Sequence, residues 1–422
     1  MKTRIYNVKI LAMAGSMDIT EGEVWIDGSR ISYAGVPKAG MPKWDREIDG
    51  GGNLLMPGFK NAHTHSPMTF LRSYADDLPL QEWLTRQIFP MEAKLTGDDV
   101  YWLTRLAIME YLTSGVTAVF DMYFHQDKVA AAAVDSGFRA VMVSGLNDYI
   151  SSLEELEESY CTYNDYHELI SYCLGFHAEY TTSPRLLTGV AALAEKYQAP
   201  VYTHNSETAA EVEQCRERYG MTPTAYLDSL GIYRYGGGGY HCVHMSDEDL
   251  DIFARQGLSI VTNPGSNTKL ASGIARISEM IGRGINLAVG TDGPASNNCL
   301  DMFREMFLVT GLAKLRQQDA SAVPAEQVLY MATAGGAKAL GLYDCDRIAP
   351  GKLADLILID LQQPNMQPVN NLVKNLVYSG SKQNVILTMV NGVVLYENGE
   401  FYIGADRSVI YQKANEIINR MK

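Results

Sequence analysis

The sequence predicts an α/β protein made of a (β/α)₈ barrel of the TIM type and a small β-sandwich domain built from both ends of the chain. In the central part of the 422 residues, short apolar runs alternate with amphipathic segments of helix length, which indicates parallel βα units. About eight such units over roughly 290 residues fit a barrel, and a doubly wound parallel sheet is the alternative. Toward both ends, strand-like runs follow one another without helices, which favours one shared β unit.

The small domain is predicted to comprise residues 1–56 and 345–422. Apolar and polar residues alternate in three N-terminal runs, at 5–11, 22–28 and 30–35. Asp27-Gly28 predicts a tight turn, and Asn391-Gly392 predicts a hairpin between C-terminal strands. The C-terminal strand candidates are 353–360, 385–390 and 393–396. We therefore expect the chain to leave this domain near residue 56 and to return near residue 345.

The barrel is predicted to comprise residues 57–344. Residues 54–56 lead into the first strand candidate, and the others are 116–121, 140–145, 174–177, 200–204, 240–243, 259–263 and 286–292. Helical segments separate them, for example at 98–114, 207–218 and 247–256. Histidine and other polar residues recur at the C-terminal ends of the strand candidates, where both a barrel and a doubly wound sheet place their functional sites.

Composition excludes several classes of function. The formal net charge of −14 disfavours binding to nucleic acid through a broad basic surface. The six cysteines form no CxxC pair and are expected to be reduced thiols. The N-terminus has no apolar signal region, and no apolar run is long enough to cross a membrane. We expect a cytoplasmic protein that binds a small molecule and has neither a nucleic-acid nor a membrane partner.

His63-Thr64-His65 is the strongest motif of the chain. It follows an apolar, strand-like run, and side chains two residues apart in a strand point to the same face. Both imidazoles can therefore reach one metal ion, and Zn²⁺ suits imidazole well. His204 and Asp292 also follow strand candidates and can complete a site of three imidazoles and one carboxylate. Taken alone, each such residue is more often a capping or hydrogen-bonded residue than a metal ligand, so it is their joint occurrence that favours a metal site.

Further titratable residues follow the same strand ends. Glu207 lies three residues after His204, where its carboxyl can face the same cavity and carry a proton to a substrate. The simpler interpretation is an acid in the first turn of a helix. Asp292 can act as both ligand and proton acceptor, or it can simply form an Asx-turn before Gly293. His177 and His241 complete the set of strand-end histidines.

On these residues the chain resembles the amidohydrolase superfamily, and within it the branch of 5-methylthioadenosine/S-adenosylhomocysteine deaminases and triazine hydrolases. The resemblance extends over nearly the whole chain. The matching segments are 57–65, 76–84, 115–117, 204–208, 241–244, 263–273, 290–298 and 351–356. It implies the barrel and the small β-sandwich domain described above, and a homo-oligomer, either a dimer or a tetramer.

The resemblance also implies one divalent metal, with Zn²⁺ as the first choice and Fe²⁺ as the alternative. Its ligands would be His63, His65, His204 and Asp292. Binuclear relatives carry a modified lysine at the fourth strand, where this chain has His177, so a single metal is expected. His177 would contact the substrate, and His241 would position the reacting group and the water.

The implied reaction is hydrolytic deamination of a ring carbon that bears an amino group. Asp292 would take the proton of the attacking water, and Glu207 would protonate the neighbouring ring nitrogen. Glu92 aligns with an acid that binds ribose hydroxyls, and Trp83 would form an apolar wall. The segment 143–152 lacks the arginines with which relatives pair a carboxylate. We therefore expect adenosine or a 5′-modified adenosine, such as 5′-methylthioadenosine or 5′-deoxyadenosine, as the substrate.

Two alternatives stay open at this stage. One is a deaminase or chlorohydrolase of another aminated ring, namely guanine, a pterin, cytosine or a triazine. The other is a barrel scaffold without catalysis, which the presence of all four ligand candidates disfavours.

Overall fold

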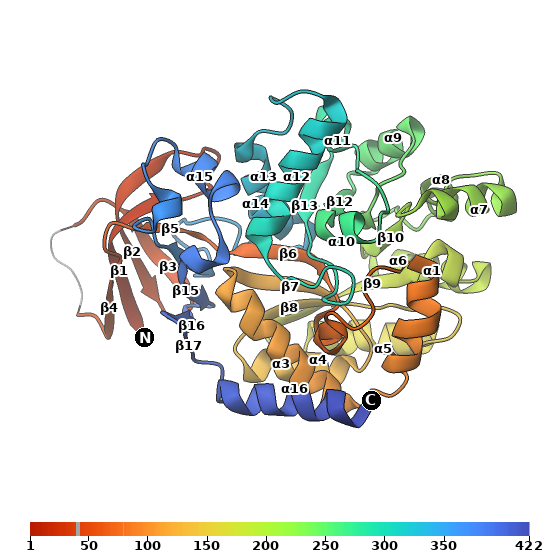
Figure 1. The fold of residues 1–422 in the computed structure, drawn as a ribbon, viewed down its shortest axis with the longest axis horizontal. Helices are drawn as coiled ribbons and strands as arrows, with labels where there is room; N and C mark the ends of the chain where they lie inside the picture. The colour runs from red at the N-terminus through yellow and green to blue at the C-terminus, as the bar shows by residue number, and fades with distance from the viewer. Residues whose placement is uncertain (39–42, 79, 422) are drawn as a thin grey trace.

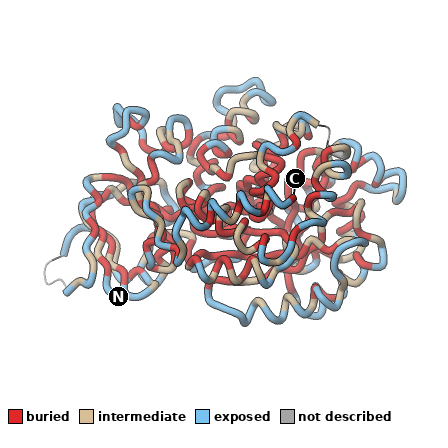
Figure 2. The backbone as a smooth tube through the Cα atoms, turned by 60° about the horizontal axis from the view of Figure 1, so that its bottom comes forward, coloured by how far each residue is buried: buried red, intermediate tan, exposed pale blue. Residues whose placement is uncertain are grey.

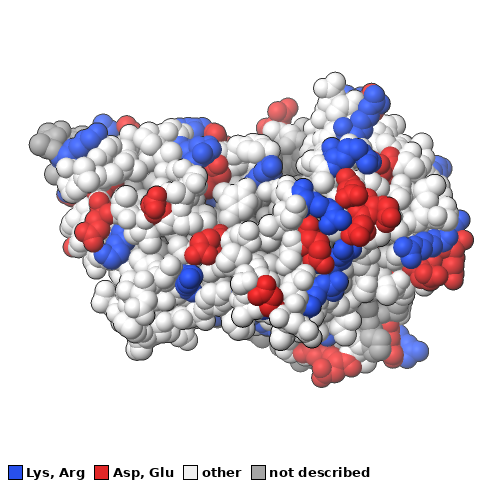
Figure 3. Space-filling view, turned by 90° about the horizontal axis from the view of Figure 1, so that it is seen from above, with Lys and Arg blue, Asp and Glu red and all other residues white. Residues whose placement is uncertain are grey.

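The chain folds into two sheets, a parallel barrel and a mixed sheet at one end of the molecule (Figure 1). The computed structural model describes residues 1–38, 43–78 and 80–421. Within these residues, no helix is long and apolar enough to cross a lipid bilayer. On the face seen in Figure 3, acidic and basic side chains are interspersed, without one broad basic patch.

The barrel contains eight strands in the order β13-β12-β11-β10-β9-β8-β7-β6. All neighbouring strands along this path are parallel. The two end strands meet where the Asp292 amide donates to the His63 carbonyl at 3.0 Å, so the sheet curls round on itself. The strands are β6 (Phe59–Thr64), β7 (Val116–Met122), β8 (Arg139–Val143), β9 (Ile170–Ala178), β10 (Val201–Asn205), β11 (Gly237–His241), β12 (Ser259–Thr262) and β13 (Asn286–Val289). The predicted (β/α)₈ barrel is confirmed, and β9 is longer than the short run expected at 174–177.

Helices follow the strands and cover the outside of the barrel (Figure 1). Thr96, Ser152 and Ser246 begin three of them with reciprocal capping boxes, which satisfy the free amides of the first turn. The helices are α3 (Gly97–Thr113), α4 (Gln126–Asp135), α5 (Leu153–Asn164), α6 (Pro184–Tyr197), α7 (Ala209–Tyr219), α8 (Pro223–Ser229), α9 (Asp247–Gln256), α10 (Pro264–Lys269), α11 (Ile277–Gly282), α12 (Met302–Gln317), α13 (Ala325–Ala332) and α14 (Ala334–Ala339). Short helical turns lie between β6 and α3: η1 (Ser66–Leu71), α1 (Leu80–Trp83), the π-helix η2 (Leu84–Ile88) and α2 (Phe89–Glu92).

Both faces of the barrel strands are buried, as Figure 2 shows for the centre of the molecule. The interior is filled by large side chains, including Phe120, Tyr202 and Tyr240, whose rings pack against one another with centroids 4.9 to 5.8 Å apart. A second apolar layer packs between the strands and the outer helices. This packing makes the strand ends a rigid platform for the side chains that follow them.

The second sheet joins both ends of the chain, as predicted. Its nine strands form one mixed sheet, in which β5 pairs antiparallel with β14. The predicted turns at Asp27-Gly28 and Asn391-Gly392 connect hydrogen-bonded hairpins. The strands are β1 (Lys2–Leu11), β2 (Ile19–Asp27), β3 (Arg30–Gly35), β4 (Arg46–Asp49), β5 (Leu54–Pro57), β14 (Leu356–Ile359), β15 (Val385–Val390), β16 (Val393–Glu397) and β17 (Glu400–Phe401).

The two parts are closely joined. Arg139 of β8 and Asp355, just before β14, form a buried ion pair with a nitrogen–oxygen distance of 2.8 Å. At the crossing into the barrel, a Cβ on Gly58 would lie 2.1 Å from the Thr117 side chain, so only glycine fits there. α15 (Leu372–Tyr378) packs on α12 and α13, and α16 (Arg407–Met421) lies along α3 (Figure 1). The division into 1–56 with 345–422 and 57–344 stays a prediction.

Candidate metal and catalytic site

Four histidines and one aspartate meet at the C-terminal ends of the barrel strands. His63 lies in β6 with His65 just after it, and His204 lies in β10. His241 ends β11, and Asp292 follows β13. Two groups have ligand atoms within 4.8 Å of one another, namely His63 with His204 and His241, and His63 with His65 and Asp292. The structure therefore brings together the four residues predicted as metal ligands, with His241 beside them.

His63 is at the centre of this cluster. Its Nε2 lies 3.5 Å from Asp292 Oδ1, and its ring centroid lies 4.8 Å from that of His65 and 4.9 Å from that of His204. The ring is fully buried and stacks on Tyr240, with centroids 3.8 Å apart. Among the described residues, neither of its ring nitrogens has a hydrogen-bond partner. Buried polar atoms are rarely left unsatisfied, so a cation bound at Nε2 fits this residue.

Two other histidines are oriented by backbone carbonyls. His65 Nδ1 lies 2.6 Å from the Met122 carbonyl oxygen, and His204 Nδ1 lies 2.7 Å from the His177 carbonyl oxygen. A carbonyl only accepts, so Nδ1 carries the hydrogen in both rings. In the neutral ring Nε2 is then unprotonated and available to a metal. His65 Nε2 points at Asp292 Oδ1 from 3.2 Å.

The charges and pKa values of the residues in this cluster also favour a bound cation. Burial lowers the pKa of His63 to about 3 and holds the pKa of His204 well below its usual value, so both rings are neutral. Burial would likewise lower the pKa of His65, but the hydrogen bond to Asp292 outweighs it and raises the pKa to about 9. With protein groups alone, the buried carboxylate of Asp292 is thus compensated by a proton on His65. A divalent cation can replace that proton, since metal binding competes with protons for the same ligands.

Three donors hold the Asp292 carboxylate. The hydroxyls of Ser266 and Ser296 each donate to Oδ2 at 2.7 Å, and the Gly293 amide donates to Oδ1 at 2.8 Å. These contacts fix the plane of the carboxylate, with Oδ1 turned to His63 and His65. Neither serine could be singled out from sequence patterns, although both lie in segments that carry the resemblance.

Glu207 lies beside this cluster and is 9% exposed. Its Oε1 is 3.9 Å from His241 Nδ1 and accepts a 3.4 Å hydrogen bond from the Ser272 hydroxyl. Burial raises the pKa of Glu207, which favours its protonated form. Thr208 caps α7, so Glu207 precedes the helix and does not belong to its first turn. The turn itself is fixed by Glu211, whose carboxylate accepts from the Glu207 amide at 2.8 Å.

His241 is held from behind by Asn267. Its Nδ1 lies 2.7 Å from the Asn267 side-chain oxygen, and its Nε2 lies 3.9 Å from Asp292 Oδ2. Both His241 and Asn267 are almost fully buried. The asparagine therefore directs the free edge of the ring into the site, a role that the sequence did not indicate.

The three predicted substrate-binding residues lie at different depths. His177 is half-buried, hydrogen-bonds through Nδ1 to the Thr181 hydroxyl at 2.9 Å, and has its ring centroid 4.9 Å from that of His204. Glu92 Oε1 accepts a 2.7 Å hydrogen bond from the Tyr123 hydroxyl. Tyr123 directly follows Met122, whose carbonyl oxygen contacts His65 Nδ1. Burial raises the pKa of Glu92 to about 7. Trp83 is buried and packs in the apolar core of the same region.

A barrel with imidazoles and a carboxylate gathered at its C-terminal end is typical of metal-dependent hydrolases. The Amidohydrolase family matches residues 54–395, and the chain belongs to this family. The family is typically metal-dependent.

Individual relatives narrow the comparison. The chain is 40% identical, over the full length of both proteins, to a protein of Thermoanaerobacter pseudethanolicus named 5-methylthioadenosine/S-adenosylhomocysteine deaminase. Among solved structures, an adenosine deaminase from Xanthomonas campestris with bound zinc is 33% identical, with a TM-score of 0.93 and coverage of 100% of this chain and 98% of that one. Atrazine chlorohydrolase from Arthrobacter aurescens, at 23% identity and a TM-score of 0.91, shares the fold over 99% of this chain and 100% of that one.

Proposed function

We propose that the protein is a metal-dependent hydrolytic deaminase of adenosine or a 5′-modified adenosine such as 5′-methylthioadenosine. It would release ammonia and the corresponding hypoxanthine nucleoside. The proposal rests on one observation. His63, His65, His204 and Asp292 lie together, and the buried ring nitrogens of His63 have no hydrogen-bond partner among the described residues. Glu207 lies beside this cluster. The names of the full-length relatives support the same reaction.

His63, His65, His204 and Asp292 would hold one divalent cation, which we propose to be zinc, with Fe²⁺ as the alternative. When bound, such a cation lowers the pKa of a water ligand toward neutrality and stabilises negative charge on its oxygen. The imidazole and carboxylate donors of this chain suit either metal.

Glu207 would supply the proton that makes the ring reactive. Its burial favours the protonated carboxyl, and Ser272 fixes its orientation. For adenine, the proton would go to N1 as water adds to C6, which draws electron density away from the carbon under attack. Asp292 would accept a proton from the attacking water, and that proton would leave with the departing ammonia.

His241 would accept a hydrogen bond from the water that adds to C6 and so position it. The contact between its Nδ1 and Asn267 leaves Nε2 facing the site, on the side of Asp292. The Asn267 side-chain oxygen only accepts, so Nδ1 carries the hydrogen and Nε2 of the neutral ring is an acceptor already oriented toward the water.

The ribose would bind between Glu92 and His177. A carboxylate accepts two hydrogen bonds readily, and the pair of ribose hydroxyls offers two donors. Trp83 would support this side of the pocket from the core. The segment 143–152 carries no arginine or lysine, so a charged amino-acid tail would lack a partner for its carboxylate. 5′-Methylthioadenosine and adenosine are therefore preferred to S-adenosylhomocysteine.

Ammonia release by the zinc-loaded protein tests the proposal. The substrates are adenosine, 5′-methylthioadenosine, S-adenosylhomocysteine, guanine, a pterin and a triazine. We expect turnover of the first two, and a loss of about 10²–10⁴-fold in kcat for Glu207→Gln with bound zinc unchanged. Glu217→Gln, an exposed position on α7, is the matched control and keeps full activity. Full kcat for Glu207→Gln, or turnover confined to guanine, a pterin or a triazine, would overturn the proposal.

We also propose a cytoplasmic location and a dimer or tetramer. Light scattering coupled to size-exclusion chromatography measures the oligomeric state directly.

A further inference from the structure

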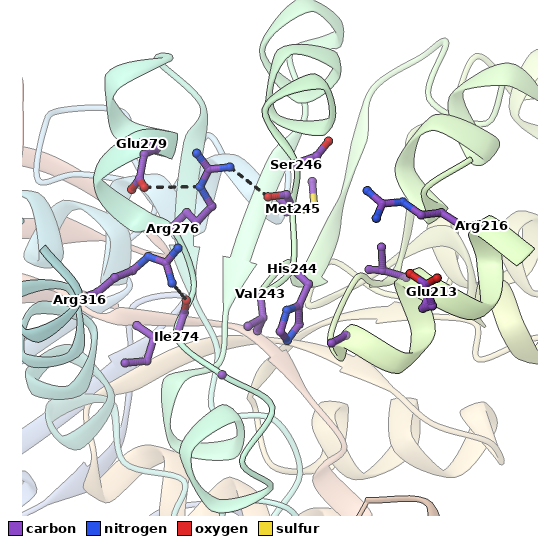
Figure 4. A pocket seen from close by; sticks show the side chains of 13 residues that line it. Glu213, Arg216, Val243, His244, Met245, Ser246, Ile274, Arg276, Glu279 and Arg316 are labelled. Atoms are coloured by element: carbon purple, nitrogen blue, oxygen red, sulfur yellow. Dashed lines mark hydrogen bonds and ion pairs between the residues drawn. The ribbon is translucent and has the colours of Figure 1, made fainter. Parts of the chain in front are cut away.

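A cavity lies next to the candidate catalytic site, and it is lined by Gly273 and Ile274, which directly follow Ser272. Its volume is about 730 Å³, within the range of small-molecule sites. Figure 4 shows Glu213 and Arg216 of α7 on one side, Arg276, Glu279 and Arg316 on the other, and the segment Val243–Ser246 between them. Neither the site histidines nor Asp292 line this cavity.

The cavity contains two guanidinium groups whose charge is not neutralised. Arg216 is exposed and, within the described residues, its side chain forms no hydrogen bond or ion pair. Arg316 donates to the Ile274 carbonyl at 3.0 Å, and it has no carboxylate partner among the residues that the structure describes.

The other charged groups do not cancel this positive charge. Arg276 is compensated by Asp247 at 2.7 Å and by Glu279 at 3.4 Å. Glu213 is the remaining lining acid, and it forms no ion pair with any described residue. Among the residues that line the cavity, three arginines face two glutamates, Glu213 and Glu279, so the lining carries one positive charge in excess.

We propose that this cavity binds a small oxyanion, a phosphate or a carboxylate group, between Arg216 and Arg316. Guanidinium groups recognise both through paired, charge-assisted hydrogen bonds. His244, on the floor of the cavity between the two sides, adds a polar group. Its Nε2 hydrogen-bonds to the Ser272 carbonyl oxygen, so the other edge of the ring faces away from Ser272. Arg216 and Arg316 line opposite sides of the cavity (Figure 4), and neither has a carboxylate partner among the described residues.

The cavity also adjoins the segments that hold the catalytic groups. The Ser272 hydroxyl contacts Glu207, while the carbonyl of the same residue is held by His244 of the cavity floor. The His244 amide in turn bonds to the Ser206 carbonyl, directly before Glu207. The oxyanion site nevertheless stands independently of the proposed deaminase function, because its residues and its test do not involve turnover.

Calorimetric titration of the zinc-loaded protein at constant ionic strength tests the proposal. Inorganic phosphate and ribose 5-phosphate probe the phosphate class, and succinate probes the carboxylate class. We expect saturable binding of at least one class below about 10 mM, and an increase in Kd of at least about tenfold for the double variant Arg216→Ala/Arg316→Ala. Glu213→Gln is expected to lower Kd, because it removes the opposing carboxylate.

Arg234→Ala, which removes an exposed arginine paired with Glu195 outside the cavity, is the matched control and should leave Kd unchanged. All these positions are exposed, so the variants are expected to fold. Failure of every probe to bind, or binding that the double variant leaves unaltered, would overturn the proposal. The second result would assign the anion to another place, such as the metal site.

Discussion

The buried ion pair between Arg139 and Asp355 makes a strong prediction about how the small sheet is fixed to the barrel. The side chains are 5% and 0% exposed, and two hydrogen bonds, at 2.8 and 3.1 Å, join the guanidinium to the carboxylate. The carboxylate also accepts from the Asn391 amide at 2.8 Å. Asp355→Ala would leave a buried guanidinium without a counter-charge and an amide without an acceptor.

Removing one partner of a buried pair costs about 3–5 kcal/mol of unfolding free energy. An unfolding entropy of about 2.1 cal/mol/K per residue gives roughly 0.9 kcal/mol/K for a chain of 422 residues. Asp355→Ala should therefore lower Tm by roughly 3–6 °C in a calorimetric scan. The double variant Arg139→Met/Asp355→Leu should recover part of this loss, since no charge remains buried.

The matched control is Glu195→Ala, which breaks the exposed pair with Arg234. Its side chains are 54% and 66% exposed, so the expected cost is below about 1 kcal/mol. A Tm for Asp355→Ala equal to that of this control would refute the reasoning. Burial alone would raise the pKa of Asp355, but Arg139, Lys60 and the backbone amide of Asn391 outweigh it and lower the pKa. The contribution is therefore present above the unfolded value of about 3.9 and is lost as the pH falls through the lower folded value.

Three further predictions concern the site. Asn267→Ala should lower kcat about 10–100-fold with bound metal unchanged, because the His241 ring loses its orientation; unchanged kcat, or lost metal, would contradict this. Glu92→Gln should raise KM for adenosine by roughly tenfold and alter kcat less, since it weakens two hydrogen bonds to ribose; equal effects on a substrate without ribose would count against that role. Activity should fall as the pH rises through the raised pKa of Glu207, because the acid form donates the proton; a pH–rate profile that keeps this limb in Glu207→Asn would exclude the assignment.

Sequence patterns predicted the barrel and the ligand candidates because both depend on local order. The alternation of apolar runs and helical segments specifies the βα repeat, and the spacing of His63 and His65 places both rings on one face. Strand ends of a barrel converge, which is why His204 and Asp292 could be grouped with them before any distance was known.

The groups that orient the site could not be predicted in this way. Ser266 and Asn267 lie in the first turn of α10 and Ser296 lies in a turn after β13, where capping or turn formation is the ordinary role for short polar side chains. Only the packing of separate βα loops brings them against His241 and Asp292. The same holds for Arg216 and Arg316, which lie far apart in the sequence and line one cavity only in the folded chain.

Anomalous diffraction at the zinc edge from crystals of the zinc-loaded protein addresses the centre of this account. We predict one strong peak per chain, bounded by Nε2 of His63, His65 and His204 and by Oδ1 of Asp292. A map with no peak among these four atoms, or with the only zinc bound elsewhere, would contradict it.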